Sequence, residues 1–253
     1  MGAVFLSGLE AGALVRGQAF QSERFDDADL AELVASDCVF EDVTFAGTSL
    51  EAARFKACRF LRCRFSHANL REAVFDDCQF YDAGAKTGPV FAFSRLEEAR
   101  LARCDLTHAR FEGCELYDLA MEDCQLLGAA FPRSTFAKAF GRKVERVAAS
   151  FTGCNLELAD LAGARLAGCR LSHCRLREAD LSGADLTGAD LTRADLFQAI
   201  VDEARLDDAD LRRAEVSGLD LRRLASYRGL IIDPDQQFRL LDALGLDVRV
   251  PPP

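Results

Sequence analysis

The chain has 253 residues, of which 49% are apolar, and a formal net charge of −10. This length allows one or two domains with a sizeable core. The negative charge argues against direct nucleic-acid binding, which needs a positive surface. No apolar run reaches the length of a membrane helix, and the first residues lack the basic start of a signal peptide, so we expect a cytoplasmic protein without membrane contact.

After a lead-in of residues 1–14, a five-residue repeat runs from about residue 15 to 222. The stretch ADLSGADLTGADLTRADL, residues 179–196, shows it most clearly, because a large apolar side chain stands at every fifth position. Between Phe151 and Leu221 these fifteen positions hold twelve Leu, two Val and one Phe. Further toward the N-terminus Phe and Leu hold most of them, with Ala35 as an exception. We call this position the central residue of each repeat.

A small residue, Ala or Cys, usually stands two positions before the central residue. A separation of two is the same-face spacing of an extended chain, so each repeat should point one large and one small side chain inward. All ten cysteines occupy the small position: Cys38, Cys58, Cys63, Cys78, Cys104, Cys114, Cys124, Cys154, Cys169 and Cys174. Their spacing does not match a zinc site, and we predict reduced core thiols, no metal and no cofactor.

A chain that turns after every such unit winds into a coil and stacks on itself, as solenoids do. The predicted fold is therefore an all-β solenoid. Its inward positions are filled by Leu, Phe, Ala and Cys, which leaves no pocket for chemistry. The three histidines, His67, His108 and His173, fall two positions after a central residue, where the chain turns outward. We predict no catalytic residue and no enzyme.

The repeat fails twice, and both failures predict loops that leave the column. The first, at about residues 81–90, contains Gly84, Gly88 and Pro89, which mark a turn. The second, at about 137–150, places Gly141 and Arg146 where large apolar residues belong. Loops carry many binding residues. By their chemistry, the candidate partner-binding residues are Lys86, Phe140, Gly141, Arg142, Lys143 and Arg146. Phe140 either anchors a partner or folds back onto the column.

The C-terminal segment, residues 223–253, predicts a helix from about Pro234 to Leu244. Asp233 suits its N-cap, Pro234 its first turn and Gly245 its C-cap. Apolar side chains are abundant here, namely Ile231, Ile232, Phe238, Leu241, Leu244, Leu246 and Val248. They either join two copies of the chain or close one end of the solenoid.

The repeat resembles that of the pentapeptide repeat family, whose motif is close to Ala-Asp/Asn-Leu-x-x. The resemblance implies a right-handed, quadrilateral β-helix with four repeats per coil, or about nine coils for this length. The two loops and the segments CQFYDAGAKTG and GLIIDPDQQFRLLDALG are similar to the Qnr-type quinolone-resistance proteins of that family.

This similarity implies a homodimer, joined through the C-terminal module, that binds DNA gyrase and possibly topoisomerase IV. The bound enzyme would be protected from quinolones or natural-product poisons, and the loops would be needed for protection. A general interaction scaffold without a topoisomerase partner remains the alternative.

The resemblance also raises the idea of an acidic rod that mimics DNA. B-DNA carries one charge per about 1.7 Å, or about three per coil height of about 4.8 Å. Here −10 spread over about nine coils is about one net charge per coil. Asp180, Asp185, Asp190 and Asp195 should ring one coil, where they either serve solubility, bond to the turns or form short acidic strips. A continuous phosphate-like track is not predicted.

Overall fold

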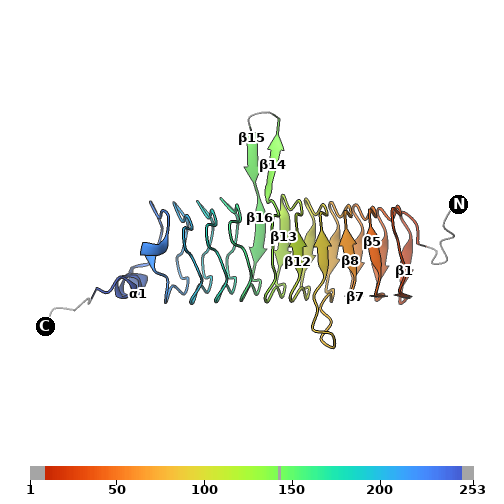
Figure 1. Ribbon diagram of the computed structural model, residues 1–253, viewed down its shortest axis with the longest axis horizontal. Coiled ribbons are helices and arrows are strands. Elements are labelled where there is room, and N and C mark those ends of the chain that lie inside the picture. The colour runs from red at the N-terminus through yellow and green to blue at the C-terminus, as the bar shows by residue number, and fades with distance from the viewer. Residues whose placement is uncertain (1–8, 142–143, 247–253) are drawn as a thin grey trace.

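In the computed structural model, which describes residues 9–141 and 144–246, the chain winds into one long column (Figure 1). Parallel pairing repeats at an offset of twenty residues, so that Val15 lies beside Ala35 and Ala35 beside Phe55. The same ladder continues as single bridges from Ser150 through Arg170 and onward to Ile231. The predicted β-solenoid is confirmed.

The column has four faces, which we number in chain order. Face 1 holds β1 (Leu14–Arg16), β3 (Val34–Ser36), β6 (Arg54–Lys56), β9 (Val74–Asp76), β11 (Arg100–Ala102), β13 (Leu119–Glu122) and β16 (Ala149–Thr152). Face 2 holds β2 (Ala19–Gln21), β4 (Val39–Glu41) and β7 (Arg59–Leu61). Face 3 holds β5 (Thr44–Ala46), β8 (Arg64–Ser66), β10 (Val90–Ala92) and β12 (Arg110–Glu112). Face 4 is paired by single bridges, such as Asp29 with Ser49 and Ser49 with Asn69.

The central residues fill the interior, as the repeat predicts. Phe40, Phe60 and Phe80 are fully buried, and neighbouring rings stack at centroid distances of 4.8 Å. This distance equals the usual spacing of paired strands, about 4.8 Å. Each coil therefore places its ring directly on the ring of the preceding coil. Ala35, the exception in the sequence, is also buried.

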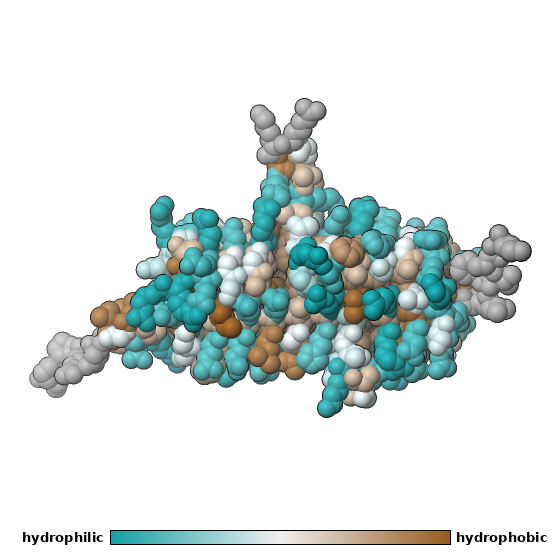
Figure 2. All heavy atoms as spheres, in the orientation of Figure 1, coloured by the Kyte–Doolittle hydropathy of each residue, from teal (hydrophilic) through white to brown (hydrophobic). Residues whose placement is uncertain are grey.

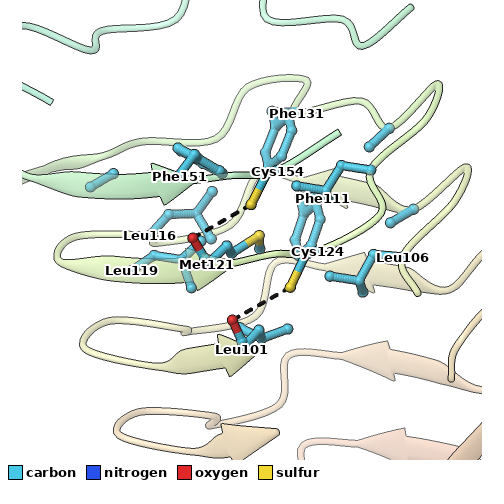
Figure 3. Close-up of a cluster of buried hydrophobic side chains, with 14 of the residues drawn as sticks. Leu101, Leu106, Phe111, Leu116, Leu119, Met121, Cys124, Phe131, Phe151 and Cys154 are labelled. Carbon is cyan, nitrogen blue, oxygen red and sulfur yellow. Dashed lines mark hydrogen bonds between the residues drawn. The ribbon is translucent and has the colours of Figure 1, made fainter. Parts of the chain in front are cut away.

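The cysteines lie in the core, free and buried, as predicted. Seven of them follow one another up a single corner: Cys38, Cys58, Cys78, Cys104, Cys124, Cys154 and Cys174. In Figure 3, Cys124 donates its thiol hydrogen to the carbonyl of Leu101 at 3.4 Å, and Cys154 donates to Met121 at 3.5 Å. At another corner, burial raises the pKa of the Cys63 thiol to about 12. The thiols therefore act as small core groups, and all but Cys38 and Cys169 also donate to a carbonyl of the preceding coil.

Aspartate and asparagine shape the corners of the solenoid. Wherever one of them directly precedes a central residue, its Oδ1 accepts the backbone N–H two positions later, as Asp180 does from Ser182 at 2.9 Å. The same bond is made by Asp29, Asn69, Asp105, Asn155, Asp160, Asp185, Asp190, Asp195, Asp210 and Asp220. The side chain takes an N–H that would otherwise pair with the preceding coil. These positions accordingly carry single bridges or no assigned strand.

The C-terminal segment forms short helices, η1 (Leu221–Arg223), η2 (Pro234–Gln236) and α1 (Gln237–Ala243). The predicted helix thus begins with a 3₁₀ turn. Gly245 ends it with φ at +78°, as expected of a C-cap. Across residues 9–141 and 144–246, no helix has the length and apolar character that crossing a membrane requires.

The ring stacks predict where stability resides. Phe60→Ala removes a fully buried ring between two stacked neighbours, and we expect it to lower the free energy of unfolding by about 3–5 kcal/mol. Phe93→Ala, at a ring that is 50% exposed, should cost less than about 1 kcal/mol. Chemical denaturation of both variants measures the difference, and equal losses would contradict the stacked core.

Candidate partner-binding surfaces

Two segments leave the column at opposite sides, and their insertion lengths show in the register. Face 3 steps from Arg64 to Val90, an offset of 26, and face 1 steps from Leu119 to Ala149, an offset of 30, where twenty is usual. The first insertion forms a short loop over residues 81–89, just before β10. The second forms an antiparallel hairpin, β14 (Ala137–Phe140) and β15 (Val144–Val147), which projects from the column (Figure 1). We call this hairpin the arm.

One side of the arm is bound to the coils before it. The Lys138 ammonium lies 3.2 Å from the carboxylate of Glu97 and 5.5 Å from the centroid of the Tyr117 ring. Glu97 is only 4% exposed, and Arg95 also reaches its carboxylate at 3.2 Å. Arg71 lies slightly farther away, at 3.8 Å. A buried carboxylate surrounded by three cations is a strong anchor, because removing it leaves charges without a partner.

The other side of the arm is bound to the coil after it. The two Glu145 oxygens accept hydrogen bonds from the Arg165 guanidinium at 2.9 and 2.6 Å. This bidentate pair holds the pKa of Glu145 below its ordinary value. The arm is therefore fixed on both sides.

The end of the arm carries apolar side chains. Phe140 is 45% exposed and Val144 is 50% exposed, and Figure 2 shows apolar surface toward the free end of the arm. Phe140 packs edge-on against Tyr117 at 5.5 Å, and the Arg146 guanidinium lies 5.4 Å from its ring centroid. Phe140 thus folds partly back onto the column while the rest of its ring faces outward, and its role as an anchor for a partner stays a prediction.

Within the turn of the arm, the structure describes Gly141. Gly141 adopts φ of +76°, which favours glycine in a tight turn. Arg142 and Lys143, two of the candidate residues, lie outside the described residues.

The smaller loop is held rigidly too. The Asp82 carboxylate accepts the backbone N–H groups of Gly84 and Ala85 at 2.9 and 3.0 Å and pairs with Arg62. A side chain at Gly88 would stand 2.3 Å from the Thr107 carbonyl, so this backbone lies directly on the next coil. Lys86 is exposed at the outer end of the loop.

The apolar residues of the C-terminal segment fall into two groups, one packed against the end of the column and one exposed. Leu240 is 4% exposed, and the buried Gln236 amide donates to the carbonyls of Leu211 and Ala214 at 2.8 and 2.7 Å. These contacts close the end of the column. Ile231, Phe238 and Leu246 remain more than 40% exposed, while Ile232, Leu241 and Leu244 are half-buried. Val248 lies outside the described residues.

The other polar candidates serve the fold. Asp190 pairs with Asp210 and Asp195 with Glu215 across neighbouring coils, and each Asp accepts a turn N–H. The histidines stand at outward corners, where His67 stacks on Phe93 at 5.4 Å. In the part of the chain that the structure describes, His, Cys, Asp and Glu do not cluster in a group of three or more that would hold a metal ion.

The anchors Glu97, Tyr117, Lys138 and Arg165 did not emerge from the sequence. Glu97 and Tyr117 occupy ordinary outward positions, directly after central residues, and they become covered only because the arm folds against them. Lys138 lies within the second failure of the repeat, at about residues 137–150. That location was the only feature of the sequence that could have pointed to it as an anchor.

The arm anchors can be tested by Glu97→Gln. We expect this change to leave Lys138 with only the more distant carboxylate of Glu98, at 3.8 Å, and to speed amide exchange across residues 137–147 by roughly tenfold or more. Glu157→Gln, which alters an ion pair of 3.5 Å with Arg175 on the column, is the matched control. Hydrogen–deuterium exchange compares the two, and an unchanged arm in Glu97→Gln would refute the anchor.

Comparisons with known proteins agree with this architecture. A family model for pentapeptide repeats, in eight copies, matches residues 24–60, 49–83, 90–123, 154–193 and 189–223. No curated protein sequence matches the chain.

Among solved structures, a trypsin-treated form of QnrB1, described as a plasmid-mediated fluoroquinolone resistance protein, has a TM-score of 0.76 at 25% identity. That match covers 92% of this chain and 99% of that one. Full-length QnrB1 has a TM-score of 0.74 at 24% identity, over 92% and 100% of the two chains. The repeats, the twenty-residue ladder and the family model, which covers well over half of the sequence, show that this chain belongs to the pentapeptide repeat family.

Proposed function

We propose that this chain binds a type II topoisomerase, DNA gyrase first and topoisomerase IV second, and protects it from quinolone or natural-product poisons. The observation that carries this proposal is the similarity to QnrB1 along nearly the full length of both chains. The two insertions support it, because a rigid column that presents a fixed arm is suited to inserting into a large enzyme.

Protection would proceed through binding alone, in the cytoplasm where these enzymes act. The anchored arm reaches into the enzyme with Phe140 and Val144 leading, and its basic residue Arg146 faces acidic protein surface. Because Lys138 and Glu145 already fix the arm, binding orders little additional chain, which favours affinity. The drug-stabilised cleavage complex is then displaced or remodelled.

A supercoiling assay with gyrase and a fluoroquinolone tests the function. We expect the wild-type protein to restore supercoiling. Replacing residues 138–146 by Asn-Gly keeps the Ala137–Val147 pair and closes the hairpin with a favoured two-residue turn, and this variant should lose rescue.

Phe140→Ser with Val144→Ser should weaken rescue by about tenfold or more, since exposed apolar anchors carry much of the binding energy. The matched control is Ile200→Ser, a 40% exposed apolar residue on the column. Absence of rescue at every protein concentration and with every topoisomerase poison would end this proposal. A pull-down without gyrase subunits would then favour the general scaffold.

We also propose that the C-terminal module joins two copies through Ile231, Phe238 and Leu246, as their exposure suggests. Sedimentation should then report twice the chain mass of 27.7 kDa. Phe238→Asp with Leu246→Asp should give monomers, because burying two new carboxylates opposes association. Leu158→Asp, at an equally exposed leucine on the column, should stay dimeric. A monomeric wild-type protein would refute the dimer.

A further inference from the structure

A groove of about 540 Å³ crosses face 1 beside the arm, over β9, β11, β13 and β16. Four of its outward positions are small, namely Ala102, Ala120, Ser150 and Thr152. β16 follows β15 with one residue between them, and in Figure 1 it lies directly below the arm. The groove is thus a shallow depression in a sheet face rather than a closed cavity.

The charges around this groove are unlike those of the whole chain. Three arginines and two acids line it, which gives +1 on a protein of net charge −10. Arg103 is paired with Asp76. Arg100 and Arg170, in contrast, make no ion pair with any residue that the structure describes. The remaining acid, Glu122, lies on the other side of the groove from these two.

The register places the two unpaired arginines in one row. Arg100 pairs with Ala120, Ala120 with Ser150 and Ser150 with Arg170. Three steps of about 4.8 Å separate their Cα positions by about 14 Å. An extended polypeptide advances about 3.3 Å per residue, so this distance corresponds to four residues. Residues four apart in an extended chain point to the same side.

We propose that the groove binds an extended acidic segment of a partner protein, running along the column axis. Carboxylates at positions i and i+4 of the segment pair with Arg100 and Arg170. A small residue at i+2 lies over Ala120 and Ser150, where the floor is shallow. Glu122 and the overall negative charge disfavour a nucleic-acid backbone, which carries a charge at every residue.

Fluorescence anisotropy with a labelled peptide, Gly-Glu-Ala-Ser-Ala-Glu-Gly, tests this on the full-length protein. Binding should be weak and should decrease with salt. Arg100→Gln and Arg170→Gln should each weaken it about threefold and together about tenfold, as expected for exposed ion pairs. Arg59→Gln is the matched control, since Arg59 holds the same repeat position on face 2 and makes no ion pair among the described residues.

Two further probes separate the alternatives. A peptide with Gln in place of both Glu should not bind, and one with its two Glu three residues apart should bind less. Equal binding by the double variant, or no binding by the wild-type protein, overturns the proposal. Tighter, Arg100-dependent binding of a single-stranded oligonucleotide would also overturn it, in favour of nucleic acid. Because the assay contains no topoisomerase, its outcome is independent of whether the chain protects one.

Discussion

The structure depends on one constraint, which is that main-chain pairing and side-chain stacking share a single period. Four repeats of five residues return the chain to the same face, twenty residues on and one strand spacing higher. Phe40, Phe60 and Phe80 then stack at 4.8 Å, so each hydrogen-bonded step also completes a hydrophobic contact. A residue inserted anywhere would shift both sets together. A long insertion must therefore leave the column and return to its register, whereas the last coil takes up a single extra residue near η1, after which Arg205 pairs with Ser226 at an offset of 21.

The smaller loop and the arm both leave the column and return in register, and both are stabilised by polar contacts to the column. The smaller loop is held by Asp82 and Arg62, and the arm by Lys138 on one side and Glu145 on the other. The period thus separates two roles. Regular coils provide a rigid frame, and the interruptions carry the surfaces that differ from one coil to the next.

The charged residues also differ in role between the regular corners and the rest of the surface. The aspartates that make the chain acidic are used at the corners, where Oδ1 of Asp180 and its counterparts accepts a turn N–H. Their abundance in the second half reflects how corners form there, which weakens an interpretation of the rod as a copy of DNA. Arg100 and Arg170 share their repeat position with other outward arginines, such as Arg59, and differ from them in lying along one groove of face 1.

The fold and the location of the insertions could be predicted from the repeat pattern alone. A five-residue period with a small residue two positions before each large one admits extended, inward-facing repeats, and Gly141 and Arg146 could not enter that core. Asp233, Pro234 and Gly245 likewise marked a helix, although its first turn proved to be 3₁₀.

How the arm is held and where the C-terminal apolar residues pack depend on contacts between distant parts of the chain. Glu97 and Lys138 are 41 positions apart in the sequence. Their contact depends on the orientation of the arm relative to the column, which a local sequence pattern does not specify. Leu240 and Phe238 belong to one short helix, yet one seals the column and the other faces outward. Arg100 and Arg170 fall in one row because the insertion between them lengthens one coil by ten residues without breaking the ladder.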